Sequence, residues 1–341
     1  MNVALDATPL TEPTGGIRRY TWELAAALAR EFPQDGYTLV SDQSYQHPAM
    51  DGVRLVNESG PLWWSYRLPR LLGREKIEVF HGTDFSVPYL PVRPTVMTVH
   101  DLSPWRGWGV SRVRRRTPWL LRFGLATMVV TPSEAIRREL LDRFPIPPEE
   151  VVAIPLAAST RFRPVESRHS GRSYFLYTGM VEPRKNLGVA LEAWRALRRD
   201  GAEVEFIVTG RVRNLQLAEE PGLRVLGEVP DDDLPALYSN AAAFVYPSLY
   251  EGFGLPVLEA MQCGAAVIAS CDPALMELSG GACLHAAADD GKGWVEAMRA
   301  VLRNGSEYRE RAKKRSKLFC WRRTAVQHRE VYLHAMRRFH G

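Results

Sequence analysis

Two glutamates, Glu251 and Glu259, stand on either side of a glycine turn in the stretch YPSLYEGFGLPVLEAMQ, residues 246–262. Pro256 suits the first position of a helix, where a missing N–H costs nothing. The N–H groups of the turn would then point out of a helix N-terminus, which is a favourable place for a phosphate. These groups belong to Phe253, Gly254 and Leu255. Glu259 could accept hydrogen bonds from a ribose, and Glu251 could reach hydroxyls of the group that the phosphate carries. The helix dipole alone also favours an early glutamate, so a purely structural role for Glu259 is an equal alternative.

A second stretch that could bind an anion is YTGMVEPRKNLGVALEAW, residues 177–194. Gly179 closes an apolar run that is typical of a strand, and Arg184 and Lys185 stand where the next helix begins. A guanidinium can contact a phosphate through two parallel hydrogen bonds and an ammonium acts as a point charge, so the pair could clamp a diphosphate. The alternative is an ordinary solvated basic pair. We favour the clamp, because both cations follow a strand in the same half of the chain as the two glutamates.

The first half of the chain offers weaker signals at two places. Gly15 and Gly16 follow the first apolar run; they do not form the G-x-G-x-x-G fingerprint, but a Gly-Gly turn lets backbone approach a phosphate or sugar closely. His100 and Asp101 end another apolar run in TVHDLSPW, a suitable place for polar groups that face a ligand. A His beside an Asp is also common for structural reasons, and His81 at a further strand end is equally ambiguous. No serine or cysteine nucleophile motif accompanies them.

The elements that must position these residues form a regular pattern. Short apolar runs alternate with helical periodicity in two series, which a polar segment with two prolines at 155–173 separates. This alternation predicts two α/β domains, each a doubly wound parallel sheet. Ligands bind at the carboxyl ends of the strands of such sheets, so we expect the domains to face each other across a central cleft. The expected strands are 2–7, 37–41, 78–82, 95–100, 127–133, 151–155, 174–179, 205–210, 223–229, 242–248 and 265–270. Expected helices include 64–73, 110–125 and 133–143, the last with Ser133 as N-cap.

Composition and charge limit the function classes. The chain has 341 residues, 45% of them hydrophobic, and a mean hydropathy of −0.22, values typical of a globular protein with two domains. We expect no secretory signal, because the first residues lack a basic segment and an apolar core, and no apolar run reaches the ~20 residues of a membrane span. The four cysteines show no metal-binding spacing, which favours free thiols in a reducing cytoplasm. The net charge of +5 is mild, and a nucleic-acid binder would leave the glutamates unexplained.

Together these stretches resemble the retaining glycosyltransferases of family 4, also called group 1. EGFGLPVLE matches the E-x7-E pattern of this family, and PRKN at 183–186 matches its second hallmark. GGIRRY, the His-Asp pair at 100–101 and VVTPSEA at 129–135 are similar to motifs of its first domain. The resemblance covers essentially the whole chain and implies the GT-B fold, with two Rossmann-like domains that face a central cleft. The implied parts are an acceptor-side domain at 1–160, a nucleotide-sugar-binding domain at 173–319 and a terminal helix at 320–341 that crosses back to the first domain.

The resemblance also implies a role for each motif residue. Glu259 would bind the ribose of a nucleotide-sugar donor, Glu251 would lie near the transferred sugar, and the basic pair would hold the diphosphate and stabilise its departure. The implied catalytic residues are Arg184, Lys185, Glu251 and His100. The implied substrate-binding residues are Gly15, Gly16, Asp101, Gly179, Phe253, Gly254, Leu255 and Glu259. No cofactor and no metal are expected, because two cations and a helix N-terminus take the place of a metal. The acidic run at 231–233 is instead predicted to cap a helix.

The donor and acceptor follow less directly. The VHDLSPW stretch resembles the bacterial mannosyltransferase branch, which implies transfer of a hexose, mannose from GDP-mannose, to a glycan or lipid-linked acceptor in cell-surface polysaccharide synthesis. A UDP-sugar-dependent glycosyltransferase and a GT-B nucleotide-sugar 2-epimerase are the alternatives, although the paired motifs argue against the epimerase. One stretch departs from the family: CDPALMEL at 271–278 stands where many relatives carry a Ser-Leu-Pro-Glu-like run, with Glu277 as the candidate equivalent.

Residues 111–123, SRVRRRTPWLLRF, mix arginines with large apolar side chains. Such a segment can lie on an anionic membrane surface and meet a lipid-linked acceptor. It can equally be a helix whose apolar face packs into the first domain, and both can hold on opposite faces. We therefore expect a cytoplasmic protein, with peripheral contact at the inner membrane face as the open alternative, and no nucleic-acid partner.

Overall fold

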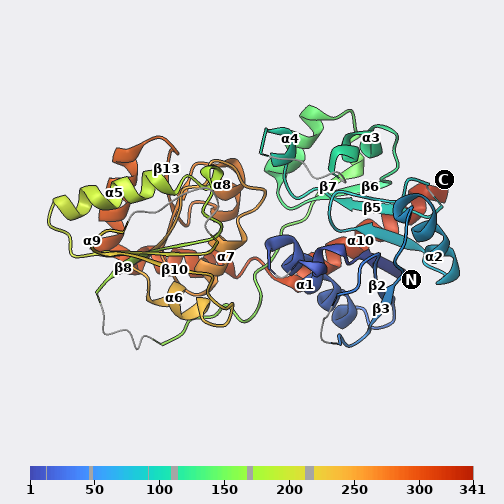
Figure 1. Ribbon diagram of the computed structural model, residues 1–341, viewed down its shortest axis with the longest axis horizontal. Coiled ribbons are helices and arrows are strands. Elements are labelled where there is room, and N and C mark those ends of the chain that lie inside the picture. Colours follow the sequence, from blue (N-terminus) through green and yellow to red (C-terminus); the bar gives the residue numbers. More distant parts are fainter. Residues whose placement is uncertain are drawn as a thin grey trace. The chain divides into compact units, whose positions relative to one another are not determined.

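The computed structural model describes residues 1–12, 14–45, 49–90, 92–108, 114–166, 172–211 and 219–340, apart from the side chain of residue 340 (Figure 1). The chain divides into two compact units. Unit 1 comprises Met1–Leu156 together with Cys320–Gly341, and unit 2 comprises Ala157–Phe319. Each unit is built around a parallel sheet of its own.

The sheet of unit 1 has, within the described residues, seven strands in the order β3-β2-β1-β4-β5-β6-β7. The strands are β1 (Asn2–Asp6), β2 (Gly36–Ser41), β3 (Val53–Asn57), β4 (Val79–Gly82), β5 (Thr95–Thr98), β6 (Met128–Thr131) and β7 (Val151–Ala153). The chain moves outward from β1 to β3 and returns to β4 on the other side of β1, so the strand order reverses between β1 and β4. The inner strands are mostly apolar and almost wholly buried, as a parallel sheet covered on both faces requires.

The helices of unit 1 are α1 (Gly16–Glu31), α2 (Leu68–Arg74), α3 (Thr117–Arg122), α4 (Glu134–Arg143) and α10 (Trp321–His340) in the described part of the chain. Short helical turns are η1 (Thr8–Thr11), η2 (Trp63–Arg67), η3 (Ser103–Trp105), η4 (Arg114–Arg116) and η5 (Pro148–Glu150). The Ser133 hydroxyl accepts a hydrogen bond from Ile136 N at 3.3 Å, which confirms the predicted N-cap of α4. α10, the red helix in Figure 1, packs against α1, β4 and β5, so residues late in the sequence complete the core of unit 1.

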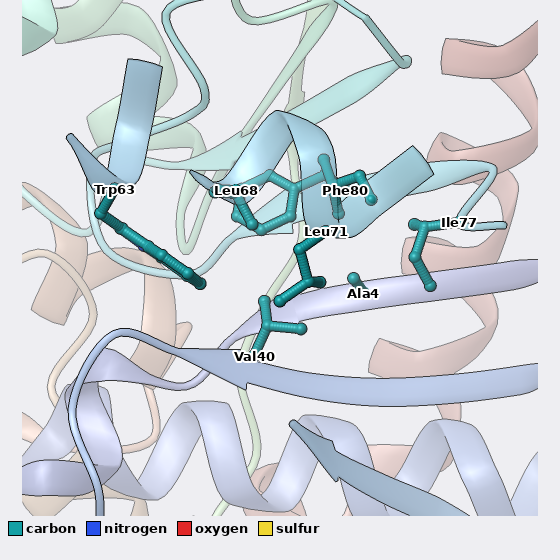
Figure 2. Close-up of a cluster of buried hydrophobic side chains, with 8 residues drawn as sticks. Ala4, Val40, Trp63, Leu68, Leu71, Ile77 and Phe80 are labelled. Carbon is teal, nitrogen blue, oxygen red and sulfur yellow. The ribbon is translucent and has the colours of Figure 1, made fainter. Parts of the chain in front are cut away.

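A hydrophobic cluster holds η2 and α2 against the sheet of unit 1 (Figure 2). The indole of η2 and the leucines of α2 pack on side chains from β1, β2 and β4. The members are Ala4, Val40, Trp63, Leu68, Leu71, Leu72, Ile77 and Phe80. Each fully buried leucine contributes roughly 1.5–3 kcal/mol. The cluster therefore stabilises β1 and β4, the two strands at which the strand order of this sheet reverses.

A chain of buried polar side chains joins α10 to the same sheet. His328 Nδ1 lies 2.8 Å from a backbone carbonyl oxygen one turn earlier in α10, and because a carbonyl can only accept, Nδ1 donates and Nε2 accepts. Tyr20 then donates to His328 Nε2 at 3.0 Å, and Thr98 donates to Tyr20 at 2.8 Å. His81 Nε2 donates to Thr98 at 2.7 Å, and Tyr332 donates to His81 Nδ1 at 2.8 Å. Burial lowers the pKa of His328 to about 4 and that of His81 well below its usual value, so both rings are neutral at pH 7.

The sheet of unit 2 has, among the described residues, six parallel strands in the order β10-β9-β8-β11-β12-β13. The strands are β8 (Tyr174–Thr178), β9 (Glu205–Thr209), β10 (Leu223–Gly227), β11 (Ala243–Tyr246), β12 (Val267–Ser270) and β13 (Leu284–Ala286). The helical elements are η6 (Pro183–Lys185), α5 (Leu187–Arg199), α6 (Leu234–Asn240), α7 (Leu255–Gln262), α8 (Pro273–Ser279) and α9 (Gly291–Ser316). Here the strand order reverses between β8 and β11.

The two parallel α/β sheets confirm the predicted fold class, and each predicted strand overlaps an observed one. Prediction from the sequence missed β3, which is largely exposed, and β13, which has three residues. The acidic run 231–233 opens a helix as predicted, but Asp233 does not cap this helix through its side chain. Asp233 takes the N-cap position of α6, but its backbone is helical rather than extended and its side chain makes no capping hydrogen bond. Asp231 and Asp232 instead lie 3.8 Å and 3.4 Å from Arg161.

The segment predicted as a helix at 110–125 is shorter in the structure. Residues 111–113 lie outside the described residues, and the helix itself covers Thr117–Arg122 with a proline in its first turn. In the part of the chain that the structure describes, no helix has both the length and the apolar character needed to cross a bilayer.

Candidate active site

The reversal of strand order in unit 2 lies between β8 and β11, and open parallel sheets bind ligands outside the carboxyl ends of strands at such a point. The two motifs of the second half of the sequence follow these two strands. Gly179 comes directly after β8 and leads to η6, whereas residues 247–254 connect β11 to α7. Pairing of β8 with β11 therefore brings the two motifs together.

Lys185 and Glu251 form a buried ion pair at this point. Lys185 Nζ donates to Glu251 Oε1 at 2.5 Å and to Tyr246 Oη at 2.8 Å, and 8% of Lys185 and 9% of Glu251 are exposed. Arg184 Nη1 donates to the Tyr250 carbonyl at 2.8 Å and lies 3.9 Å from Glu251 Oε1. Arg184 also pairs with Glu182 at 3.0 Å, so two cations and two carboxylates lie close together in a poorly solvated place.

The charges of this group set the protonation of its members. Burial raises the pKa of the Glu251 carboxyl, but the positive charges of Lys185 and Arg184 outweigh this effect and hold the pKa below its usual value. Burial, and then the negative charge of Glu251, raise the pKa of Tyr246 well above its usual value. At pH 7 the group therefore holds an ionised glutamate and a neutral tyrosine.

The turn before α7 has the backbone that its glycine predicts. Gly254 is the N-cap of α7 with φ 98°, and a Cβ at this position would lie 2.4 Å from Leu275 Cδ2, so a larger residue would be both strained and crowded. Within the described residues, the N–H groups of Phe253, Gly254 and Leu255 donate no hydrogen bond. They are the unsatisfied donors of a helix N-terminus and could bind an anion.

Glu259 lies in α7 with 2% of its surface exposed. Tyr238 Oη donates to Glu259 Oε2 at 3.4 Å and lies 2.7 Å from Thr178 Oγ1, at the end of β8. Burial, and then the charge of Glu259, raise the pKa of Cys263 to about 12. Glu259 is therefore linked through Tyr238 to the end of β8, next to Gly179.

One residue of this site was missed by prediction from the sequence. Asp272 follows β12 and caps α8: its Oδ1 accepts from Ala274 N at 3.0 Å and from Leu275 N at 3.1 Å. Its other oxygen, Oδ2, accepts from the backbone N–H of Glu251 at 3.2 Å. Burial raises the pKa of Asp272 to about 6. An Asp before a Pro is a recognisable helix start, but its contact with Glu251 depends on the pairing of β11 with β12.

The candidates of unit 1 lie at two strand ends. Gly15 is the exposed N-cap of α1 with φ 137°, and Gly16 begins the helix. His100, after β5, is 9% exposed and donates through Nε2 to the Thr83 carbonyl at 2.7 Å, which leaves Nδ1 as the unprotonated nitrogen. Burial lowers the pKa of His100, so the ring is a neutral hydrogen-bond acceptor at pH 7.

Asp101 has a local structural role. Its Oδ1 accepts from Ser103 N at 2.9 Å and from Ser103 Oγ at 2.6 Å, which closes a tight turn into η3. A further buried acid, Asp6, ends β1 and was also missed by prediction from the sequence. Its Oδ1 accepts from Thr8 N at 3.0 Å, and burial raises its pKa to about 7.

In chemical terms, unit 2 presents two cations and a row of backbone N–H groups at one end of its sheet. Fixed positive charge and oriented dipoles of this kind stabilise an anion that forms during a reaction. The described residues contain no group of three His, Cys, Asp or Glu side chains arranged to hold a metal ion.

Comparison with known proteins shows which family the chain belongs to. Residues 14–162 match the family model described as Glycosyltransferase Family 4, and residues 159–319 match the model described as Glycosyl transferases group 1. The chain is 31% identical to O-antigen chain mannosyltransferase B of Escherichia coli, across 97% of this chain and 99% of that protein. The chain belongs to the group 1 glycosyltransferases.

Solved structures place the fold of this glycosyltransferase among GT-B enzymes. It superposes on a sucrose-phosphate synthase from Thermosynechococcus elongatus with a TM-score of 0.75 at 18% identity, over 98% of both chains. It superposes on Anabaena HepE, solved in complex with UDP and glucose, with a TM-score of 0.72 at 18% identity, over 96% of this chain and 98% of that one. The GT-B fold predicted from the sequence is thereby confirmed, and the family models together with the mannosyltransferase relative confirm the predicted glycosyltransferase activity.

Proposed function

We propose that this glycosyltransferase transfers mannose from GDP-mannose to a glycan or lipid-linked acceptor in cell-surface polysaccharide synthesis, without a metal ion and with retention of anomeric configuration. The similarity to an O-antigen chain mannosyltransferase over nearly the whole of both chains supports the sugar and the pathway class. The observation that carries the reaction type is the buried group of Arg184, Lys185 and Glu251 at the strand-order reversal of unit 2.

The diphosphate of the donor binds Arg184, Lys185 and the N–H groups before α7. Reaction breaks the bond between the anomeric carbon and the phosphate oxygen, and the electron pair stays on the diphosphate. The acceptor hydroxyl oxygen bonds to the anomeric carbon from the same face, and its proton passes to the departing phosphate oxygen. The cations are already fixed where this negative charge develops, so little reorganisation opposes the step.

The carboxylates bind the two sugars. Glu259 accepts hydrogen bonds from the ribose hydroxyls, and Glu251 accepts from a hydroxyl of the transferred hexose. Before donor binding, Glu251 neutralises Lys185 at 2.5 Å. The diphosphate takes over part of that contact, which leaves the Glu251 carboxylate available to the hexose. Gly179 keeps the backbone close to the donor at the end of β8.

Unit 1 contributes the remaining contacts in this proposal. Gly15 and Gly16, at the exposed start of α1, approach the diphosphate through backbone N–H groups, and His100 accepts a hydrogen bond from a hexose hydroxyl at Nδ1. Asp101 supports this region by holding the turn that follows His100.

A peripheral membrane contact through 111–123 is part of the proposal. We define an aromatic–arginine patch by Tyr89, Trp119, Phe123 and Arg116. Trp119 and Phe123 are 50% and 60% exposed with their ring centres 5.1 Å apart, and Arg116 donates to Tyr89 Oη at 2.5 Å. The two leucines between Trp119 and Phe123 are buried, so α3 packs into unit 1 on one face and presents this patch on another. Aromatic rings beside arginines suit an anionic lipid surface, which would hold the protein at the inner membrane face.

The proposed donor is tested with purified protein and a panel of GDP-, UDP- and ADP-sugars. GDP-mannose is expected to raise the melting temperature most, because it binds the folded state. It is also expected to be the donor from which the sugar is transferred to the acceptor glycan. Incubation with donor alone separates the alternatives: an epimerase would alter the donor sugar, whereas a transferase leaves it unchanged or hydrolyses it slowly. A larger shift and transfer with a UDP-sugar would contradict GDP-mannose as the donor.

The membrane contact is tested by vesicle sedimentation. Trp119→Ser with Phe123→Ser is expected to weaken binding to phosphatidylglycerol vesicles, whereas Leu302→Ser, at a 40% exposed position in unit 2, is the matched control. Equal binding of both variants would argue against the patch as the contact.

A further inference from the structure

We propose that Asp272 is a positioning residue for the transfer reaction. It holds the backbone of Glu251, and through Glu251 the ammonium of Lys185, in the place from which both groups meet the donor. This proposal rests on the proposed function of the Lys185–Glu251 pair. Nothing in the resemblance to the family points to Asp272, which lies in the stretch 271–278 where the sequence departs from the family pattern.

Both oxygens of Asp272 are committed, and to different elements. Oδ1 accepts from two N–H groups at the start of α8, at 3.0 Å and 3.1 Å, and Oδ2 accepts from Glu251 N at 3.2 Å. The side chain is 6% exposed, so these contacts are shielded from water. A serine or asparagine would serve α8 equally well as a cap. A carboxylate is needed because a second acceptor oxygen must face Glu251.

The rest of the loop is held at other residues. Ser270 Oγ donates to the Ser248 carbonyl at 2.6 Å, and Arg184 Nη1 donates to the Tyr250 carbonyl at 2.8 Å. Asp272 acts at Glu251 itself, from the end of the neighbouring strand β12. It therefore fixes the point from which the Glu251 side chain extends to Lys185, 2.5 Å away at its tip.

Asp272→Asn separates the two contacts. Asparagine has one oxygen, and that oxygen stays with the two N–H groups of α8, where the helix dipole also repels an NH2 group. The NH2 group then faces the N–H of Glu251, so a hydrogen bond becomes a contact between two donors. The matched control is Asp290→Asn in the same unit: Asp290 caps α9 by accepting from Gly293 N at 3.0 Å, and among the described residues its carboxylate has no hydrogen bond or ion pair with Glu251.

The experiment measures kcat and KM for donor, and melting temperature, for Asp272→Asn, Asp290→Asn, Glu251→Gln and the double variant Asp272→Asn/Glu251→Gln. We expect Asp272→Asn to lose on the order of 10²-fold in kcat, because a small misplacement of reacting groups has this effect. It should also melt somewhat below Asp290→Asn, because the buried N–H of Glu251 loses its acceptor. In the Glu251→Gln background the Asp272 change should have little further effect. If Asp272→Asn does not fold, Asp272→Ser, a strong cap too short to reach both elements, replaces it.

Two results would overturn the proposal alone: a wild-type kcat in Asp272→Asn, or losses in the double variant that multiply as if the two sites were independent. A wild-type rate in Glu251→Gln would instead contradict the proposed function of the pair itself, and the positioning role would fall with it. The two failures are therefore distinguishable.

Discussion

The Lys185–Glu251 pair allows stability and catalysis to be separated by mutation. Both side chains are nearly buried, at 10% and 11% exposure, so Lys185→Met leaves an ionised carboxylate in a poorly solvated place. Removing one partner of a buried ion pair costs about 3–5 kcal/mol, and the lower end applies here because Arg184 Nη1 remains 3.9 Å from Glu251. For a unit of this size, about 3 kcal/mol corresponds to a melting temperature lower by about 6–12 °C.

The double variant Lys185→Met/Glu251→Gln removes both charges and is expected to regain most of that stability. Transfer should stay low in both variants, by about 10²–10³-fold, because the cation that meets the departing diphosphate is gone in each. Calorimetry at pH 7.5 and a radiolabelled transfer assay measure the two quantities. Arg195→Met is the control: Arg195 lies 2.6 Å from Glu220 in the same unit, but the pair is 32% and 25% exposed and its loss should cost less than about 1 kcal/mol. A Lys185→Met variant that melts at the same temperature as Arg195→Met, or a double variant no more stable than Lys185→Met, would contradict this role of the buried pair.

Three further outcomes are expected. Burial lowers the pKa of His328 in the folded chain to about 4, so below pH 6.5 the unfolded chain binds a proton there that the folded chain does not, and stability falls by about 2 kcal/mol at pH 5. In melting experiments at different pH values, His328→Gln should remove this contribution. His334→Gln, at an exposed position of α10, should leave it unchanged. Glu259→Gln should weaken GDP binding measured by calorimetry, and unchanged affinity would remove its role at the ribose. His100→Asn keeps a hydrogen-bond acceptor near the position of Nδ1, whereas His100→Gln keeps the donor to the Thr83 carbonyl at the position of Nε2. His100→Asn should therefore retain more transfer activity than His100→Gln. The reverse ranking would contradict the assignment of the proton to Nε2.

The sequence predicted most of the fold because its signals are local. Buried parallel strands are continuous apolar runs, and Ser133 is a helix cap that needs no knowledge of distant residues. The edge strands β3 and β13 escaped prediction because they are exposed or very short, so little apolar surface marks them. The residue type of Asp233 predicted a capping side chain, but its backbone is helical and its side chain makes no capping hydrogen bond.

In the candidate site, too, local sequence signals were predictable and contacts between distant residues were not. The two motifs of unit 2 could be read from residue types and spacing, and the switch in strand order at β8 and β11 explains why they meet. The partners of each residue could not be read in this way. Asp272 reaches Glu251, and Tyr246 reaches Lys185, only because strands far apart in the sequence lie side by side.

The buried hydrogen bonds that join Tyr332 and His328 of α10 to the sheet of unit 1 have a consequence for biosynthesis. α10 is translated after the whole of unit 2, so the ribosome spends roughly 10–30 s on the intervening residues. During that interval the residues of β4 and β5 have been synthesised, but His81 lacks the phenol of Tyr332 and Tyr20 lacks the imidazole of His328. Unit 1 therefore cannot reach its native state during translation of its own first part, and nascent chains should depend on chaperones that shield the docking surface of the last helix until it emerges.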